Sequence, residues 1–381
     1  MTVPAFDWHQ PVQVSFGAGC SDTLAEALGE RAVCVLAFAP ATALGLRARW
    51  QARLGARLRA WIEVPEGLST FAMARHLAAD LWPALADAAA APAAPPAVLV
   101  GLGGGSALDL AKLLRVRPLG GDARAGFEAV AAAVRGEHPW PAHLRTPLWL
   151  VPTTAGTGSE VTRWATLWDT DGELAVKRSF DEPWGHADRA FVDPALTTTA
   201  PAAVTRDSAL DALSHALEAL WNRHANPVSD ALAVQAARRV VLHLPAVLRQ
   251  PGVPAGREQL ALAALEAGLA FAQTRTALAH ALSYPLTLEQ GVPHGLAVAA
   301  WLPTAWELAA GREPRLDALL ARVFDVPAAA GAGALRRWLA AMGVADAMAD
   351  GGAAFGITDG PARLQAALRS ERGRNFIGAA G

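Results

Sequence analysis

The sequence predicts a doubly wound parallel α/β domain over residues 1–195 and an all-α domain over residues 196–381. Before Asp193, short apolar runs that suit buried strands alternate with helical patterns, as in a sheet covered by helices on both faces. After it, the chain continues as Ala/Leu-rich helical patterns separated by Gly/Pro punctuation. With 381 residues, the chain is long enough for two domains that each bury a core.

The composition argues against several classes of function. Lys and Arg number 33 against 35 Asp and Glu, without a basic block, so no nucleic-acid partner is expected. Charged residues or prolines interrupt the apolar stretches well short of the about 20 residues that a membrane span needs. Two cysteines are too few for a disulfide framework. Since MTVPAFDWHQ lacks the pattern of a signal peptide, we expect a soluble cytoplasmic protein without a membrane partner.

A glycine-rich turn at 103–105 is the first candidate for a nucleotide site. PAVLVGL predicts a strand before the turn, and ALDLAKLLR predicts a helix after it. Ser106, with Asp109 three residues later, is a capping pattern for that helix. Exposed N–H groups at a helix start favour a pyrophosphate. A glycine-rich turn alone is usually only a tight turn, so the prediction depends on the strand and helix around it.

One carboxylate and three imidazoles form the constellation that best suits reaction chemistry. Asp211 and His215 lie four residues apart and share a face if their run is helical. His280 opens HALSYPLTLEQGVPHG, and His294 lies near its end. These donors suit Fe, Zn, Co or Ni, without a thiolate that would single out zinc. Such an i,i+4 pair is usually a solvated face, but apolar neighbours would bury Asp211, and a buried carboxylate needs a cation or several donors.

Five ordered motifs carry a family resemblance. DALSHALEALWNRHANPVSDALA and HALSYPLTLEQGVPHGLAVAAWLP resemble the signature regions of the iron-containing (group III) alcohol dehydrogenase family. GGGSALDLAK, VPTTAGTGSEVT and FVDPALTTTAP are similar to its other motifs. The resemblance implies a dehydroquinate synthase-like architecture with a Rossmann-like first domain, NAD(P) bound between the two domains, and a homodimer. It also implies a catalytic divalent metal, Fe²⁺ before Zn²⁺, held by Asp211, His215, His280 and His294.

The resemblance further implies which residues approach the nucleotide. They are the residues of the glycine-rich turn, the hydroxyl residues of PTTAGTGSEVT and one lysine: Gly103, Gly104, Gly105, Ser106, Asp109, Thr153, Thr154, Thr157, Ser159, Thr162 and Lys177. An ordinary polar turn and a solvated hairpin lysine are the alternatives. Family members that prefer NAD commonly carry an acidic residue where this chain has Ala37, Phe38 and Ala39, so NADPH would be tolerated.

Two candidate catalytic residues flank His280. Tyr284 stands where many members of the family carry a further histidine. Its hydroxyl would donate a proton or hold a substrate oxygen, and a buried ring with one hydrogen bond is an equal alternative. Arg275 lies in an apolar run expected to be helical from 260 to 282, where it needs an anion. That anion is a structural carboxylate such as Glu218 or Glu266, or an anionic group on the substrate.

QTRT with HALSYPLT looks like the phosphonate metabolism-associated branch of the family. This implies a metal-dependent NAD(P)-linked alcohol dehydrogenase or aldehyde reductase acting on phosphonoacetaldehyde and 2-hydroxyethylphosphonate. Generic short-chain alcohol or polyol dehydrogenases and a dehydroquinate synthase-type lyase are alternatives, although the several substrate-binding cations of the lyase are not evident. Maleylacetate reductases lack the metal, and the retained Asp211 and His215 argue against them. Loss of a ligand would favour a non-enzymatic binding protein, and no ligand is lost.

Overall fold

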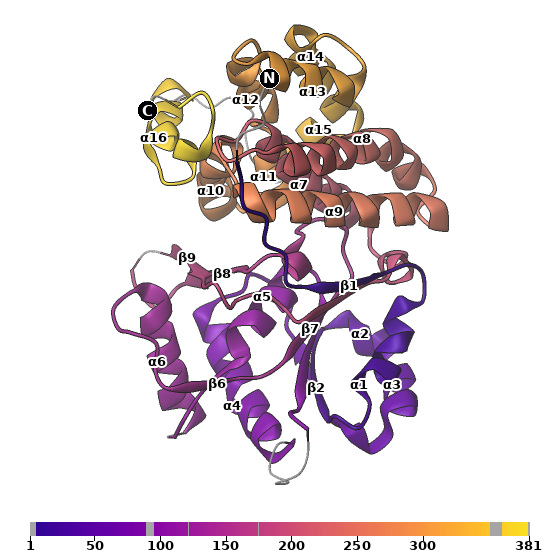
Figure 1. Ribbon diagram of the computed structural model, residues 1–381, viewed down its shortest axis with the longest axis vertical. Coiled ribbons are helices and arrows are strands. Elements are labelled where there is room, and N and C mark those ends of the chain that lie inside the picture. The colour runs from indigo at the N-terminus through magenta and orange to yellow at the C-terminus, as the bar shows by residue number, and fades with distance from the viewer. Residues whose placement is uncertain (1–4, 89–94, 121, 174, 351–359, 380–381) are drawn as a thin grey trace. The chain divides into compact units, whose positions relative to one another are not determined.

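The computed structural model describes residues 5–88, 95–120, 122–173, 175–350 and 360–379, which form two compact units (Figure 1). The sheet unit comprises Pro11–Thr153 and Ser159–Leu196. The helical unit comprises the chain up to Gln10, the short segment Thr154–Gly158, and the chain from Thr197 onward. The segment Thr154–Gly158 therefore packs with the helices, although the strand before it belongs to the sheet.

Six parallel strands form the main sheet, in the order β1-β10-β7-β4-β2-β3. Their bounds, in that order, are Gln13–Phe16, Arg189–Val192, Leu148–Pro152, Val98–Gly103, Val33–Phe38 and Leu58–Val64. From β2 the chain first adds β3 on one side and then returns to add β4 on the other. Ligands of such sheets bind beyond the carboxyl ends of the strands at the point of reversal. Phe38 and Gly103 end the two strands at this point.

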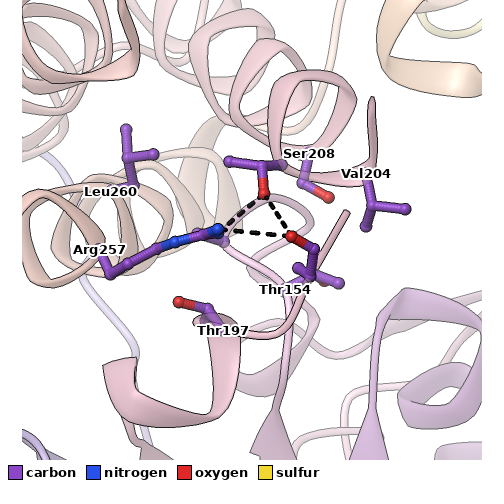
Figure 2. Close-up of a pocket in the computed structure, with 9 residues that line it drawn as sticks. Thr154, Thr197, Val204, Ser208, Arg257 and Leu260 are labelled. Carbon is purple, nitrogen blue, oxygen red and sulfur yellow. Dashed lines mark hydrogen bonds between the residues drawn. The ribbon is translucent and has the colours of Figure 1, made fainter. Parts of the chain in front are cut away.

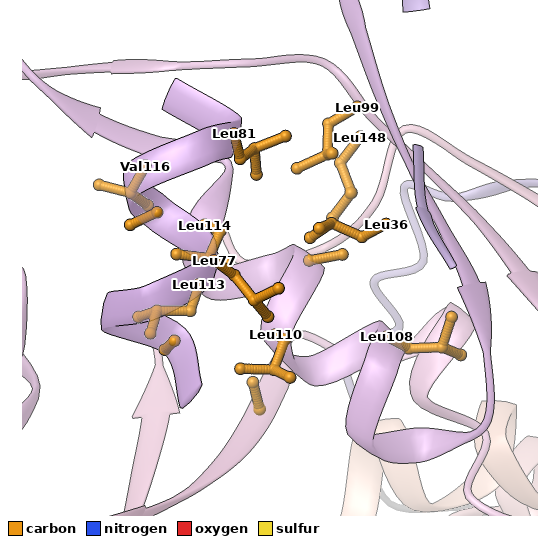
Figure 3. Close-up of a cluster of buried hydrophobic side chains, with 14 of the residues drawn as sticks. Leu36, Leu77, Leu81, Leu99, Leu108, Leu110, Leu113, Leu114, Val116 and Leu148 are labelled. Atoms are coloured by element: carbon orange, nitrogen blue, oxygen red, sulfur yellow. The ribbon is translucent and has the colours of Figure 1, made fainter. Parts of the chain in front are cut away.

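Helices cover both faces of the sheet because alternate side chains of a buried strand point to opposite faces. Cys34 and Leu36 of β2 join one core, whereas Val33 and Val35 join the other. The first core includes side chains of α4 (Phe71–Ala88), α5 (Gly105–Leu114) and α6 (Ala123–Arg135), and Figure 3 shows its leucines. The second includes side chains of α1 (Leu24–Leu28), α2 (Pro40–Ala43) and α3 (Leu46–Leu54). These two layers confirm the predicted doubly wound sheet.

Two antiparallel strand pairs complete the sheet unit. They pair β5 (Val116–Pro118) with β6 (His143–Arg145), and β8 (Trp164–Asp169) with β9 (Val176–Asp181). β8 packs against α5, the helix that follows the glycine-rich turn.

The helical unit is built around α7 (Ala202–Leu220), which packs against α8 (Pro227–Arg249) and α9 (Pro254–Thr274). Every side chain of α7 from Ala209 to Leu220 is buried, as expected of a helix that is mostly apolar on all sides. The later helices are α10 (Leu278–Gln290), α11 (His294–Ala299), α12 (Leu302–Ala309), α13 (Pro314–Phe324), α14 (Ala328–Ala341), α15 (Val344–Asp350) and α16 (Gly360–Arg369). This unit confirms the predicted helical C-terminal domain.

By length and composition alone, Pro227–Arg249 and Pro314–Ala341 could each cross a membrane. This is weak evidence, because core helices of soluble proteins meet the same criterion. α8 packs against α7 and α9, and the second stretch is divided into α13 and α14 at Asp325, whose φ is 53°.

Candidate metal centre and nucleotide loops

Three imidazoles of the helical unit converge on one carboxylate oxygen. Oδ1 of Asp211 lies 3.7 Å from Nε2 of both His215 and His280. It lies 3.9 Å from Nε2 of His294. Asp211 and His215 come from α7, His280 from α10 and His294 from the first position of α11. The first three residues are buried, whereas the His294 side chain is 37% exposed, so the cluster is accessible beside His294.

The donor atoms of this cluster fit a divalent cation. Oδ1 of Asp211 and Nε2 of His280 are buried without a hydrogen-bond partner in the part of the chain that the structure describes. Leaving such atoms unsatisfied costs about 1–3 kcal/mol each. Burial lowers the pKa of His215 to about 4, so its imidazole is neutral at neutral pH, as metal ligation requires. Asp211, His215 and His280 offer ligand atoms within 4.8 Å of one another.

Glu218 is a site residue whose role sequence reasoning missed, since the sequence suggested it only as a partner of Arg275. It is fully buried on α7, and its Oε2 lies 2.7 Å from Nδ1 of His280. Burial alone would lower the pKa of His280, but the carboxylates of Glu218 and Asp211 together outweigh burial and raise it. Donation from Nδ1–H directs the Nε2 lone pair of His280 toward Asp211. Helical spacing was the available signal, because Glu218 lies three residues after His215 on the same face.

The same carboxylate also holds the start of α10. It accepts the backbone N–H of Ala277 at 2.6 Å and that of Ala279 at 2.5 Å. Unsatisfied N–H groups at a helix start favour a negative charge. α9 ends at Thr274 and α10 begins at Leu278, so the expected continuous helix from 260 to 282 is wrong. The break lets one buried carboxylate both start a helix and orient its first histidine.

Arg275 lies at this break with φ of 68°, a left-handed value that is uncommon outside glycine. Its side chain is 40% exposed, and Nη1 lies 3.8 Å from Oε1 of Glu371. The structural partners expected from the sequence are therefore wrong. Glu218 holds α10, and Glu266 pairs with Arg239 at 2.9 Å. Arg275 lies in a partly exposed turn rather than inside an apolar helix.

Tyr284 lies one helical turn after His280 on α10. Burial raises the pKa of Tyr284 to about 12, so its hydroxyl is protonated at neutral pH. The guanidinium carbon of Arg372 lies 5.4 Å from the centroid of its ring. Arg372 also donates to Oγ1 of Thr276 at 3.0 Å.

The C-terminal segment that carries Arg372 is ordered. Nδ2 of Asn375 donates to the carbonyl of Thr276 at 2.9 Å, and the N–H of Ile377 donates to the carbonyl of Trp221 at 3.0 Å. Phe376 is fully buried. The described residues up to 379 are therefore packed as part of the helical unit.

The glycine-rich turn lies at the carboxyl end of β4, at the reversal point of the sheet. Gly103 has φ of 153°, and a Cβ there would lie 2.8 Å from Cβ of Ala107 and 3.0 Å from Cβ of Phe38. This position therefore requires glycine. Gly104 is the N-cap of α5 and has ordinary extended backbone, and no side chain caps the helix. An uncapped helix start at this place suits a phosphate group.

The predicted capping of α5 by Ser106 and Asp109 is wrong. The helix already begins at Gly105, and the Ser106 hydroxyl donates to the carbonyl of Gly67 at 3.2 Å. Asp109 is held inside the sheet unit, where it accepts the Ser159 hydroxyl and the Thr166 N–H, each at 2.7 Å. The Asp109 carboxylate therefore links α5 to Ser159 and, through the Thr166 N–H, to β8.

Lys112 is a buried cation that sequence reasoning did not single out. Its Nζ donates to the carbonyl of Trp164 at 2.6 Å and to Oγ1 of Thr162 at 3.3 Å. Burial lowers the pKa of Lys112 to about 8. Lys177, the lysine that the family resemblance implied as a nucleotide contact, lies on β9. Its Nζ is 5.7 Å from the ring centroid of Trp168. Thr162 and Lys177 are thus both placed around the β8–β9 hairpin.

The threonines after β7 are divided between the two units. Thr153 belongs to the sheet unit, and its N–H donates to the Gly103 carbonyl at 3.0 Å. Thr154 and Thr157 belong to the helical unit. Thr154 lines a small cavity beside the buried Arg257, whose Nη1 donates to Oγ1 of Thr205 at 2.8 Å (Figure 2).

Comparisons with known proteins cover both units. Residues 11–194 match the family described as iron-containing alcohol dehydrogenase, and residues 205–368 match its C-terminal region. An alcohol dehydrogenase from Thermococcus barophilus is 38% identical over 213 residues, 56% of this chain and 54% of its own length. A sulfoacetaldehyde reductase from Bilophila wadsworthia is 33% identical over 211 residues, 54% of this chain and 51% of its own. The chain spans about half the length of these curated relatives.

Solved structures share the fold over nearly the whole chain. A crystal structure of an iron-containing alcohol dehydrogenase has a TM-score of 0.76 at 26% identity, covering 99% of this chain and 96% of that one. The sulfoacetaldehyde reductase from Bifidobacterium kashiwanohense, in complex with NAD⁺, has a TM-score of 0.81 at 24% identity, with coverage of 98% and 95%. The second likeness concerns the fold alone. From the two matched regions and the shared fold, the chain belongs to the iron-containing alcohol dehydrogenase family.

Proposed function

We propose that the protein is a metal-dependent, NAD(P)-linked alcohol dehydrogenase or aldehyde reductase. The observation that carries this proposal is the convergence of three imidazoles on the buried, unsatisfied Oδ1 of Asp211. When bound, a divalent ion polarises a carbonyl oxygen as a Lewis acid, and a nicotinamide exchanges hydride with the carbonyl carbon. The donor set suits iron or zinc, and we propose iron from the family.

The residues of the chain supply orientation and charge. Asp211 contributes one negative charge, and the buried His215 is neutral at neutral pH. Glu218 fixes the ring of His280 through Nδ1. Tyr284 lies one turn beyond His280, and we propose that its protonated hydroxyl donates a hydrogen bond to a substrate oxygen.

We also propose that the pyrophosphate of the dinucleotide lies at the glycine-rich turn. The uncapped start of α5 and its position at the reversal of strand order support this assignment. β2 ends at Phe38 without a carboxylate to repel a 2′-phosphate, so both NADH and NADPH are proposed cofactors.

The proposed substrate is a small anionic aldehyde, namely phosphonoacetaldehyde or a close analogue. Arg275 and Thr276 lie in the turn directly before α10, whose first turn carries His280, and both offer donors for an anion. A relative that is 33% identical is named for sulfoacetaldehyde, an aldehyde with an anionic group. Other relatives are named for uncharged alcohols such as 1-propanol, so an uncharged substrate is the alternative.

The proposal is tested with chelated, dialysed protein reloaded with Fe²⁺ or Zn²⁺ under anaerobic conditions. NAD(P)H oxidation is then measured with phosphonoacetaldehyde, sulfoacetaldehyde and propanal. We expect activity that depends on the metal and a higher kcat/KM for the anionic aldehydes. Absence of metal-dependent oxidation with every aldehyde would reject the dehydrogenase proposal, and a preference for propanal would reject only the anionic substrate.

A further inference from the structure

The C-terminal segment 370–379 is an integral part of the helical unit. Besides the contacts of Asn375 and Ile377, the N–H of Arg223 donates to the carbonyl of Asn375 at 2.8 Å. Trp221 and Arg223 directly follow α7, the helix that supplies Asp211 and His215. The segment therefore bonds both to the end of α7 and to the turn before α10, two of the three helices that carry candidate ligands.

Arg372 is the residue by which this segment reaches the neighbourhood of His280. Two of the residues that it contacts, Thr276 and Tyr284, lie four residues before and four residues after His280. Residues four apart on a helix face the same side, with about 5–6 Å between their Cβ atoms. The ring under the Arg372 guanidinium is thus the next group on the face of α10 that carries His280. The Arg372 guanidinium therefore lies beside a residue that is one helical turn from His280.

Arg372 is also better prepared to receive an anion than Arg275. The Thr276 hydroxyl and the face of the Tyr284 ring hold its guanidinium in place, which lowers the entropy lost on binding. Arg275 is 40% exposed and already has the carboxylate of Glu371 within 3.8 Å. A guanidinium can donate two parallel hydrogen bonds to a phosphonate or sulfonate.

We propose that Arg372 is the specificity-determining residue that receives the anionic group of the substrate. Thr276 and Tyr284 position its guanidinium, and the C-terminal segment completes the substrate site. This inference rests on the proposed function, since it assigns the anionic half of the same site.

The test compares Arg372→Met with Arg374→Met, which removes an exposed arginine from the same segment. Both variants are assayed with phosphonoacetaldehyde and with propanal, and their bound metal is measured. For Arg372→Met we expect kcat/KM to fall on the order of 30-fold or more with phosphonoacetaldehyde and by less than about 3-fold with propanal. Arg374→Met should match the wild type on both substrates. Equal losses on the two substrates in Arg372→Met would overturn the inference.

A binding measurement separates this inference from the dehydrogenase proposal. Calorimetry with 2-hydroxyethylphosphonate is performed on the metal-loaded wild type, Arg372→Lys and Arg372→Met. The inference predicts binding in the wild type, weaker binding in Arg372→Lys because lysine lacks the planar fork, and the weakest in Arg372→Met. This order would support the inference even if no aldehyde were turned over, which would reject only the dehydrogenase proposal. If Arg372→Met does not fold, the comparison of wild type with Arg372→Lys decides, and equal affinity overturns the inference.

Discussion

Oε2 of Glu218 lies 2.7 Å from Nδ1 of His280, and both side chains are buried from solvent. Glu218→Gln keeps the shape of the side chain but removes its charge, so the His280 ring loses its strongest acceptor. Losing such an outer partner of a ligand typically weakens metal affinity by about 10–100-fold. Competition with a metal-binding dye measures the change.

The matched control is Glu266→Gln on α9, which removes a carboxylate that pairs with Arg239 away from His280. It should leave metal affinity unchanged. Wild-type affinity in Glu218→Gln would show that this carboxylate only supports the helix start.

His280→Ala removes a buried donor whose Nε2 lies 3.7 Å from Asp211. We expect loss of bound metal and of any metal-dependent turnover. Ligand binding to the folded state raises stability, so chelation should lower the Tm of the wild type and leave that of the variant unchanged. His76→Ala on α4, an exposed position in the sheet unit, is the control. Full metal content and turnover in His280→Ala would contradict the assignment of this ligand.

Gly104→Val should weaken binding of the nicotinamide cofactor without unfolding the chain. Gly104 has φ of −78° and ψ of −175°, which valine adopts without strain. The added side chain would occupy the start of α5, where the pyrophosphate is proposed. Fluorescence titration with NADH measures the affinity. Gly103→Ala separates folding from binding, because its φ of 153° and the Ala107 contact predict a lower Tm. Unchanged NADH affinity in Gly104→Val would place the dinucleotide elsewhere.

Arg275→Met should reduce kcat/KM for phosphonoacetaldehyde more than for propanal. Because Glu371 already lies near its guanidinium, we expect a loss of about 1–2 kcal/mol, smaller than for Arg372→Met. Steady-state kinetics on the two aldehydes gives the comparison. An equal loss with both aldehydes would indicate that Arg275 stabilises the turn before α10 and does not bind the anionic group.

The buried Lys112 should make stability depend on pH in the alkaline range. Burial lowers its pKa from 10.5 to about 8, so the folded state releases this proton before the unfolded state does. Between these two values the unfolded chain binds more protons, and the free energy of unfolding should therefore rise with pH. Urea denaturation across that range should show this contribution in the wild type and not in Lys112→Met. If the free energy of unfolding changed with pH in the same way in both proteins, groups other than Lys112 would be responsible.

Local patterns in the sequence were sufficient to predict the fold. The apolar run around VCVLAF predicts a buried parallel strand at 31–39, and β2 spans Val33–Phe38. The alternation of such runs with helical patterns, followed by helices alone, predicts the sheet and the helical unit. Ordered motifs also identified the candidate ligands Asp211 and His280, because family signatures are contiguous in sequence.

Only the tertiary structure determines which side chains form hydrogen bonds with one another. Glu218 and His280 are 62 residues apart, and Thr276 and Arg372 are 96 apart. A local pattern predicts burial and periodicity, but hydrogen-bond partners depend on how distant elements pack. The same reason explains why Asp109 bonds to Ser159 instead of capping α5. The helix break at Arg275 likewise follows from a distant carboxylate, because Glu218 stabilises the start of α10 where the sequence favours an unbroken helix.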